Sequence, residues 1–183
     1  MLEEVLIAGF GGQGILLAGE LLAQAAMDEG REVAWVPTYG PEQRGGTANC
    51  TVIVSDEEIG SLIGNPPTAA IIMNAPSLDK FEPMVKTGGV LVVNRSLAPR
   101  QVARQDLRVV SIPVSEMAVE LGNERLANMV ALGAFLGATR LVPLDHVIVT
   151  LPKALPRASA ELLELNRRAL REGANYVEVN ACV

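Results

Sequence analysis

The chain has 183 residues, 49% of them hydrophobic, and a formal net charge of −6. This length predicts a single domain over residues 1–183, and the acidic balance argues against nucleic acid as a partner, which would need a dense basic face. Because there is no apolar run near the ~20 residues of a membrane span, no signal peptide and only two cysteines, we expect a cytoplasmic protein with reduced thiols and no membrane contact.

The core must be aliphatic, because aromatic residues make up only 3% of the chain. Such cores are typical of parallel sheets covered by helices. Short apolar or alternating runs bounded by turn-forming residues predict six strands. The predicted strands are Val5–Ala8, Glu32–Val36, Asn49–Ser55, Ala69–Met73, Val90–Val93 and Val109–Ile112. The fold class that we predict is α/β, a three-layer Rossmann-like domain with a mostly parallel sheet.

Four stretches are predicted to be helical from their apolar spacing and composition. They are Ile15–Met27, Leu126–Leu136, Leu144–Leu151 and Ser159–Arg171. The third is rich in β-branched residues and could also be interpreted as a strand. In the fourth, Glu164 and Arg168 have the spacing of an ion pair, and Gly173 is expected to end the helix.

A glycine-rich motif, G-x-G-x-x-G, covers residues 9–14 between the first predicted strand and the first predicted helix. Glycines let a ligand approach the backbone closely, and a helix N-terminus attracts anions, so the motif favours a phosphate-bearing ligand. A nicotinamide dinucleotide also needs an acidic residue at the end of the second strand, where this chain has Val36 and Pro37. The alternative to a ligand is tight packing of helix on sheet, or contact with another chain.

A second cluster of special residues lies between the second and third predicted strands, at residues 37–48. Two prolines restrict the backbone there, three glycines permit unusual backbone angles, and Tyr39, Glu42, Gln43 and Arg44 carry polar groups. This composition favours a recognition loop at the sheet edge where open α/β proteins bind their ligands. The alternative is a plain surface connection.

The two clusters together, followed by the strand Asn49–Ser55, resemble the gamma subunit of 2-oxoacid:ferredoxin oxidoreductases. Residues 128–134 and 166–173 are similar to the same family, so the resemblance spans nearly the whole chain. After Ser61 the chain departs from the family pattern, because Leu62–Pro67 stands in place of a proline and an acidic stretch. Contacts carried over to that segment are therefore not expected to hold.

The resemblance implies an oxidoreductase assembly that decarboxylates a 2-oxoacid, transfers the acyl group to coenzyme A and passes electrons to ferredoxin or a similar acceptor. It also implies alpha, beta and delta (ferredoxin-like) partner subunits, which hold thiamine diphosphate, magnesium and iron–sulfur clusters. The chain has two cysteines, fewer than the four thiolates of a cluster. This subunit is expected to be inactive alone, with a structural or coenzyme A-side role. The expected substrate is 2-oxoglutarate, followed by pyruvate.

The candidate ligand-binding or subunit-interface residues are all in the two clusters, and none is expected to be catalytic or to bind metal. They are Gly9, Gly11, Gly12, Gln13, Gly14, Tyr39, Gly40, Pro41, Glu42, Gln43, Arg44, Gly45 and Gly46. One alternative is a stand-alone NAD(P)-binding enzyme, which predicts dinucleotide binding by the isolated chain. Another is a non-enzymatic scaffold, which predicts association without an effect of substrate or coenzyme A. The isolated chain could also form a homodimer.

Several other polar side chains are predicted to have structural roles. His146 has no serine or cysteine motif near it, so a catalytic triad is not expected. Cys50 lies in an apolar strand and is interpreted as a small core residue. Asn74 and Asn94 each end a buried strand and are expected to cap the next helix.

Overall fold

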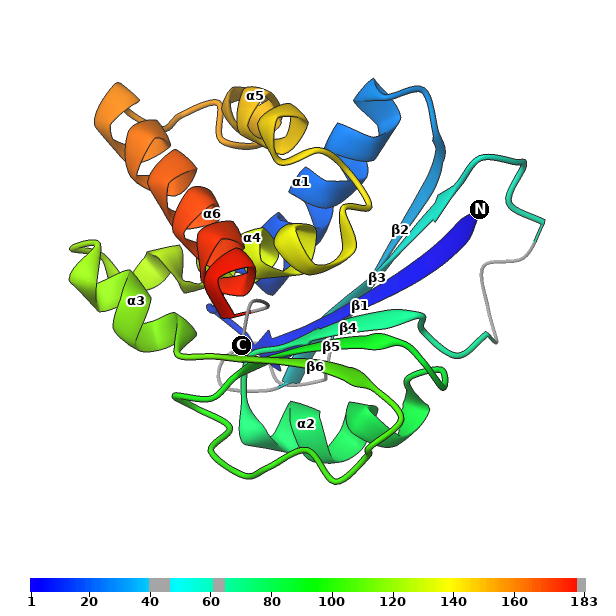
Figure 1. Cartoon of the computed structure of the whole chain (residues 1–183). Coiled ribbons are helices and arrows are strands. Elements are labelled where there is room, and N and C mark those ends of the chain that lie inside the picture. Colours follow the sequence, from blue (N-terminus) through cyan, green and yellow to red (C-terminus); the bar gives the residue numbers. More distant parts are fainter. Residues whose placement is uncertain (40–46, 61–64, 181–183) are drawn as a thin grey trace.

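The computed structural model describes residues 1–39, 47–60 and 65–180 (Figure 1). Its strands form one six-stranded sheet in the order β2-β3-β1-β4-β5-β6. They are β1 (Leu2–Phe10), β2 (Glu32–Tyr39), β3 (Thr47–Ser55), β4 (Ala69–Ile72), β5 (Val90–Asn94) and β6 (Arg108–Ile112). Only β3 runs antiparallel to its neighbours, while β1, β4, β5 and β6 pair in parallel. The predicted strands and the mostly parallel sheet are confirmed.

The helices cover the two faces of the sheet unequally. Helices α1, α4, α5 and α6 lie on one face in Figure 1, and α2 lies on the other. The helices are α1 (Ile15–Asp28), α2 (Ala75–Phe81), α3 (Val114–Glu120), α4 (Ala127–Thr139), α5 (Leu144–Ala154) and α6 (Ala160–Asn180). The α/β class with helices on both faces is therefore confirmed, and the β-branched segment 144–151 is helical. No sequence pattern predicted α2 and α3.

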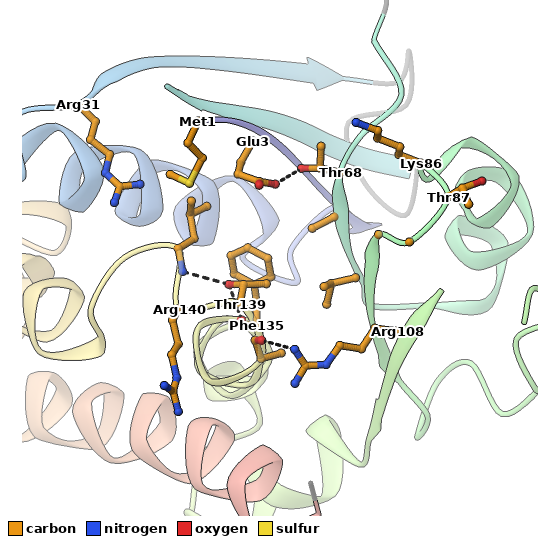
Figure 2. Close-up of a pocket in the computed structure, with 16 residues that line it drawn as sticks. Met1, Glu3, Arg31, Thr68, Lys86, Thr87, Arg108, Phe135, Thr139 and Arg140 are labelled. Carbon is orange, nitrogen blue, oxygen red and sulfur yellow. Dashed lines mark hydrogen bonds between the residues drawn. The ribbon is translucent and has the colours of Figure 1, made fainter. Parts of the chain in front are cut away.

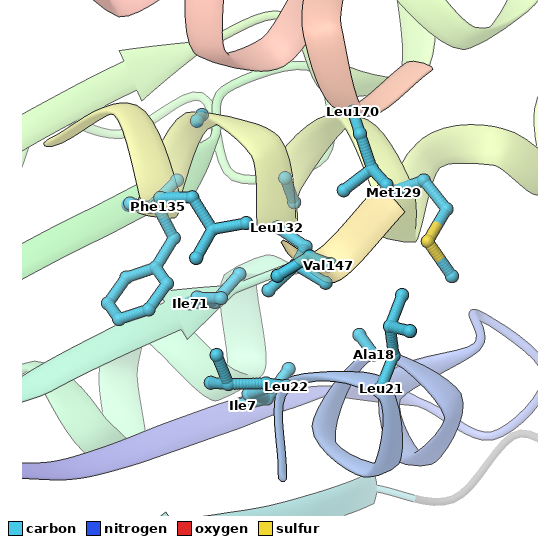
Figure 3. Close-up of a cluster of buried hydrophobic side chains, with 14 of the residues drawn as sticks. Ile7, Ala18, Leu21, Leu22, Ile71, Met129, Leu132, Phe135, Val147 and Leu170 are labelled. Atoms are coloured by element: carbon cyan, nitrogen blue, oxygen red, sulfur yellow. The ribbon is translucent and has the colours of Figure 1, made fainter. Parts of the chain in front are cut away.

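Alternate residues of the central strands belong to two different hydrophobic clusters. Val5 and Ile7 face the larger cluster, which α1, α4, α5 and α6 cover, whereas Leu6 and Ala8 face the smaller one beneath α2. Figure 3 shows Ile7 on β1 directed toward the side chains of α1 and α4. Because side chains of a strand point alternately to the two faces, a continuous apolar run such as 5–8 is typical of a strand covered on both sides.

Helix α6 continues past Gly173, so the prediction that this glycine ends the helix was wrong. A Cβ atom at Gly173 would meet the carbonyl oxygen of Val130 on α4, and one at Gly133 would meet that of Leu170 on α6. These glycines instead let the two helices cross with their backbones in contact. The predicted ion pair of Glu164 with Arg168 does not form. Glu164 Oε2 instead lies 3.2 Å from Arg167 Nη1.

The two asparagines that end buried strands have different roles. The Oδ1 atom of Asn74 accepts a hydrogen bond from the Ser77 backbone N–H at 2.9 Å and caps α2, as predicted. Asn94 caps no helix: its Oδ1 accepts from the Ser96 N–H at 3.2 Å, and its Nδ2 donates to Ser115 Oγ at 3.0 Å. It therefore fixes the turn after β5, because no helix follows that strand directly.

The predicted structural roles of Cys50 and His146 agree with their surroundings. Cys50 is fully buried, and this burial raises the pKa of its thiol to about 11, which keeps the thiol protonated at neutral pH. The Nδ1 atom of His146 lies 2.7 Å from Glu29 Oε1 and joins α5 to the end of α1. Within the described ranges, no helix combines the length and hydropathy needed to cross a membrane.

Candidate functional site

The two clusters predicted from the sequence begin at the same edge of the sheet. The glycine-rich motif leaves the end of β1, and β3 starts beside it, because Phe10 is paired with Thr47. The end of β2 lies next along that edge, with Tyr39 paired with Ala48. Residues Gly40, Pro41, Glu42, Gln43, Arg44, Gly45 and Gly46 connect these two strands and lie outside the described residues. The sheet register therefore places one end of this segment, at Thr47, beside the glycine-rich motif, and the other end, at Tyr39, one strand further along the same edge.

The glycine-rich motif forms a tight turn closed by Gln13. The Gln13 backbone N–H donates to the Phe10 carbonyl at 3.2 Å, and Gln13 Oε1 accepts from the Phe10 N–H at 2.6 Å. Gly12 and Gly14 have left-handed backbone angles, with φ of 96° and 73°, which favour glycine. At Gly9 an added Cβ would lie 2.5 Å from Gln13 Oε1. Three of the glycines are thus required by the turn itself.

Asn128 at the start of α4 holds this turn from the side of the core. Its Nδ2 donates to the Gly14 carbonyl at 3.1 Å, and its Oδ1 accepts from the Met129 N–H at 2.9 Å. The residue is only 4% exposed. Sequence reasoning placed Asn128 in the family resemblance but gave it no role. The available signal was a lone amide at the start of an otherwise apolar helix, since a buried amide needs partners.

A cavity of about 390 Å³ opens beside Gly12 and Gln13. Its other walls come from the turn after β5, from α3 and from the start of α4, namely Leu97, Ser115, Val119, Glu124, Arg125 and Ala127. Leu97 and Val119 are 46% and 63% exposed, and Phe10 next to the turn is 37% exposed. Exposed apolar side chains around a hollow are typical of a surface that meets a ligand or another protein. Except for the glycine turn, these walls were not predicted as a site.

The chemistry that this edge offers is binding rather than catalysis. Gly14, which precedes α1, gives the helix no side-chain cap, so the first N–H groups of α1 can receive an anion. Among the described residues, no group of three His, Cys, Asp or Glu side chains could hold a metal ion.

The position of β3 also argues against a dinucleotide site. In dinucleotide-binding folds the acidic partner of the ribose stands at the end of the second strand, beside the glycine loop. In this chain β3 separates β1 from β2, so the end of β2 is roughly 10 Å from β1, or two strand spacings. Its last residues, Thr38 and Tyr39, carry no carboxylate. The alternative of a stand-alone NAD(P)-binding enzyme therefore has no structural support at this edge.

Known protein sequences similar to this chain include subunits of several oxidoreductases. Residues 4–176 match the family described as pyruvate ferredoxin/flavodoxin oxidoreductase. The 2-oxoglutarate synthase subunit KorC of Methanocaldococcus jannaschii is 32% identical over 164 residues, which cover 88% of each chain. The ketoisovalerate oxidoreductase subunit VorA of Methanothermobacter marburgensis is 39% identical over 181 residues, 96% of this chain but 37% of VorA. The chain thus spans just over a third of the length of that relative.

Two solved structures share the fold over nearly the whole chain. The gamma subunit of a keto/oxoacid ferredoxin oxidoreductase from Geobacter sulfurreducens has a TM-score of 0.81 and 31% identity, covering 97% of this chain and 99% of its own. The 2-oxoglutarate:ferredoxin oxidoreductase of Magnetococcus marinus, described with 2-oxoglutarate, coenzyme A and succinyl-CoA bound, has a TM-score of 0.88 and 25% identity, covering 97% of this chain and 31% of its own. The chain therefore belongs to the pyruvate ferredoxin/flavodoxin oxidoreductase family and matches a gamma subunit of that family along its full length.

Proposed function

We propose that this chain is the gamma subunit of a cytoplasmic, multi-subunit 2-oxoacid:ferredoxin oxidoreductase that converts a 2-oxoacid to acyl-CoA. The observation that carries the proposal is the match to the Geobacter gamma subunit over almost all of both chains. In VorA the matching region is about a third of a longer chain, so this unit also occurs joined to further protein. We expect residues 1–183 to act as one domain that functions only in contact with the catalytic subunits.

The proposal assigns the redox chemistry to the alpha, beta and delta partners. Thiamine diphosphate with magnesium would supply the decarboxylation there, and iron–sulfur clusters would pass the electrons to ferredoxin or a similar acceptor. The described residues of this chain offer no metal-binding group of three, and its two cysteines are fewer than the four thiolates of a cluster. The contribution of this chain is therefore to bind and position other groups.

The glycine-rich edge would form one wall of the coenzyme A path. Its uncapped α1 N-terminus suits a phosphate group, and its exposed apolar side chains, Phe10, Leu97 and Val119, suit a neighbouring subunit. From the sequence, we extend the proposal to Arg44, whose guanidinium group can bind a phosphate or a partner carboxylate through two hydrogen bonds. Tyr39, Glu42 and Gln43 would hold neighbouring groups by hydrogen bonds.

Replacing Gly12 tests whether phosphate approaches this edge. An added Cβ at Gly12 would have no atom within 4 Å. The left-handed backbone, with φ of 96°, strains any side chain there, and because Asp and Asn bear this strain alike, the comparison between the two variants cancels it. Gly12→Asp and Gly12→Asn have nearly the same shape and differ by one negative charge. We expect the aspartate variant to raise the KM for coenzyme A on the order of tenfold over the asparagine variant, with kcat little changed, because one repelling charge at close range costs about this factor. Equal KM values for the two variants would show that no phosphate of coenzyme A approaches this edge.

The substrate class is tested by reconstitution of the assembly with and without this chain. The VorA relative is 39% identical and the KorC relative 32%, so ketoisovalerate should be assayed first, ahead of the 2-oxoglutarate expected from the sequence. The measurement is coenzyme A-dependent reduction of a dye by ketoisovalerate, 2-oxoglutarate and pyruvate. We expect the assembly to oxidise one of these three 2-oxoacids, and to do so only when this chain is present. Full activity without the chain would favour the scaffold alternative instead.

A further inference from the structure

A second cavity, of about 450 Å³, lies at the opposite edge of the sheet from the glycine-rich motif. Figure 2 shows it between the end of α4 and the segments that lead into the strands. Thr68 precedes β4, residues 86–89 precede β5, and Arg108 begins β6. Because these strands are parallel, their starts lie a full strand length from the edge that we assign to coenzyme A. The proposed function leaves this cavity without a role.

Positive charge is concentrated around this cavity. Four of the 15 Lys and Arg residues of the chain line it, against one carboxylate, Glu3. The four are Arg31, Lys86, Arg108 and Arg140, and each comes from a different segment. Figure 2 shows the guanidinium of Arg140 directed away from Phe135, toward α6, so the other three carry the argument. In a chain of net charge −6, this local excess is opposite in sign to the average. Such a cavity attracts anions.

Neighbouring groups neutralise this charge only in part. The Nε atom of Arg31 is 3.7 Å from Glu29 and 4.0 Å from Asp56, while its Nη1 is buried without a hydrogen-bond partner. Arg108 Nη1 donates to a neutral backbone carbonyl, at 2.7 Å. Within the described part of the chain, Lys86 and Arg140 form no ion pair. A buried guanidinium nitrogen without a partner is costly, and an anion in the cavity would supply one.

The rest of the lining indicates what kind of anion fits. Ala69, Val90, Phe135 and Leu141 line it with apolar atoms, and of these Val90 is the one that is partly exposed. Figure 2 shows Phe135 with Arg31 to one side and Arg108 to the other. The cavity volume is in the range of small-molecule sites, which combine an apolar wall with a few polar groups. Separate cations on several sides suit a ligand with more than one negative group. An apolar wall beside them suits a ring or an aliphatic body.

We propose that this cavity binds a small molecule that carries two or more phosphate groups and an apolar body, of the nucleoside diphosphate class. Lys86 and Arg108 would contact the phosphates from the strand side, and Arg31 would contact them from the end of α1. The cations hold a phosphate ester by charge-assisted hydrogen bonds, and the partly exposed Val90 gives the base an apolar contact. The site is independent of the glycine-rich edge and of the assignment to a gamma subunit.

The test is calorimetric titration of the full chain with ADP and with pyrophosphate at fixed ionic strength. The variants are Lys86→Gln and the double variant Lys86→Gln with Arg108→Gln. The native Lys86 side chain is exposed and forms no described hydrogen bond, so its replacement should not disturb the fold. Arg168→Gln on the exposed side of α6 is the control, because it removes the same charge elsewhere. We expect the double variant to weaken ADP binding at least tenfold, Lys86→Gln to weaken it severalfold, and the control to leave it unchanged.

A footprint on the three lysines of the chain, Lys80, Lys86 and Lys153, locates the ligand without a mutation. ADP should protect Lys86 from acetylation and leave Lys80 reactive. As a separate control, Gly12→Asp should bind ADP like the wild type, because Gly12 lies at the other edge of the sheet. Equal affinity in wild type and Lys86→Gln, or no protection of Lys86, would overturn the proposal. It would also be overturned if ADP bound the isolated chain but not the assembled enzyme, because a partner's acidic side chains would then be the true occupant.

Discussion

Gly173→Ala is expected to lower the free energy of unfolding by about 2 kcal/mol, although alanine is the better helix former by about 1 kcal/mol. The new Cβ would meet the Val130 carbonyl oxygen and come within 2.8 Å of the Ala134 nitrogen, both in the backbone of α4. Backbone atoms cannot move aside as a flexible side chain can, and overpacking of this kind costs about 1–3 kcal/mol. Urea unfolding followed by circular dichroism measures the change.

Asn175→Ala is the matched control for this prediction, because Asn175 lies on the exposed side of the same helix. It should leave stability within about 0.5 kcal/mol of wild type. Because α4 carries Asn128, which holds the Gly14 carbonyl, a shift of α4 should also reach the glycine-rich turn. A Gly173→Ala protein as stable as wild type would show that the contact between α4 and α6 is looser than the structure has it.

Glu82→Gln is expected to cost about 2 kcal/mol at neutral pH, because hydrogen bonds to charged groups contribute about 1.5–3 kcal/mol each. Glu82 is 3% exposed. Its Oε1 accepts from the N–H groups of Ala103 and Arg104 at 2.6 and 3.0 Å, and its Oε2 is 2.7 Å from Arg100 Nη2. One carboxylate thus fixes the segment that leads from β5 to β6. Thermal unfolding of the two proteins measures the loss.

The same residue predicts a pH dependence of stability. Burial alone would raise the pKa of Glu82, but hydrogen bonds from Arg104, Arg100 and Ala103 outweigh it and lower the pKa below its usual 4.5. The folded state therefore binds fewer protons than the unfolded state, so the stabilisation is complete above pH 4.5 and is lost as the pH falls through the folded pKa. The difference between wild type and Glu82→Gln should shrink below pH 4.5. A difference that stays constant down to pH 3 would contradict this assignment.

Local patterns were sufficient to predict the strands and the glycine-rich turn. Residues 5–8 form a short apolar run of the kind found in doubly covered strands, and the motif at 9–14 lies between a strand and a helix as predicted. The insertion of β3 between β1 and β2 had no such signal, because strand order depends on pairing between segments distant in sequence. Helices α2 and α3 have seven residues each, too few for a helical period to show.

Tertiary packing explains most of the remaining differences from the sequence predictions. Gly173 has the sequence signal of a helix end, and only the crossing with α4 reveals its role. Similarly, Leu97 and Val119 come from segments without a motif and reach the glycine-rich edge through the turn after β5 and through α3. The basic cavity joins Arg31, Lys86 and Arg108 from three parts of the chain. Neither grouping could be predicted from residue spacing.

The assignment to a gamma subunit is tested by expressing the chain with its neighbouring genes and purifying it through a tag on its own terminus. Mass spectrometry of the eluate, with an assay of coenzyme A-dependent 2-oxoacid oxidation, gives the answer. We predict that chains carrying thiamine diphosphate and iron–sulfur clusters will elute together with this one and with the activity. A chain that elutes alone under conditions where the catalytic subunits are present and active, or that binds NAD by itself, would contradict the assignment.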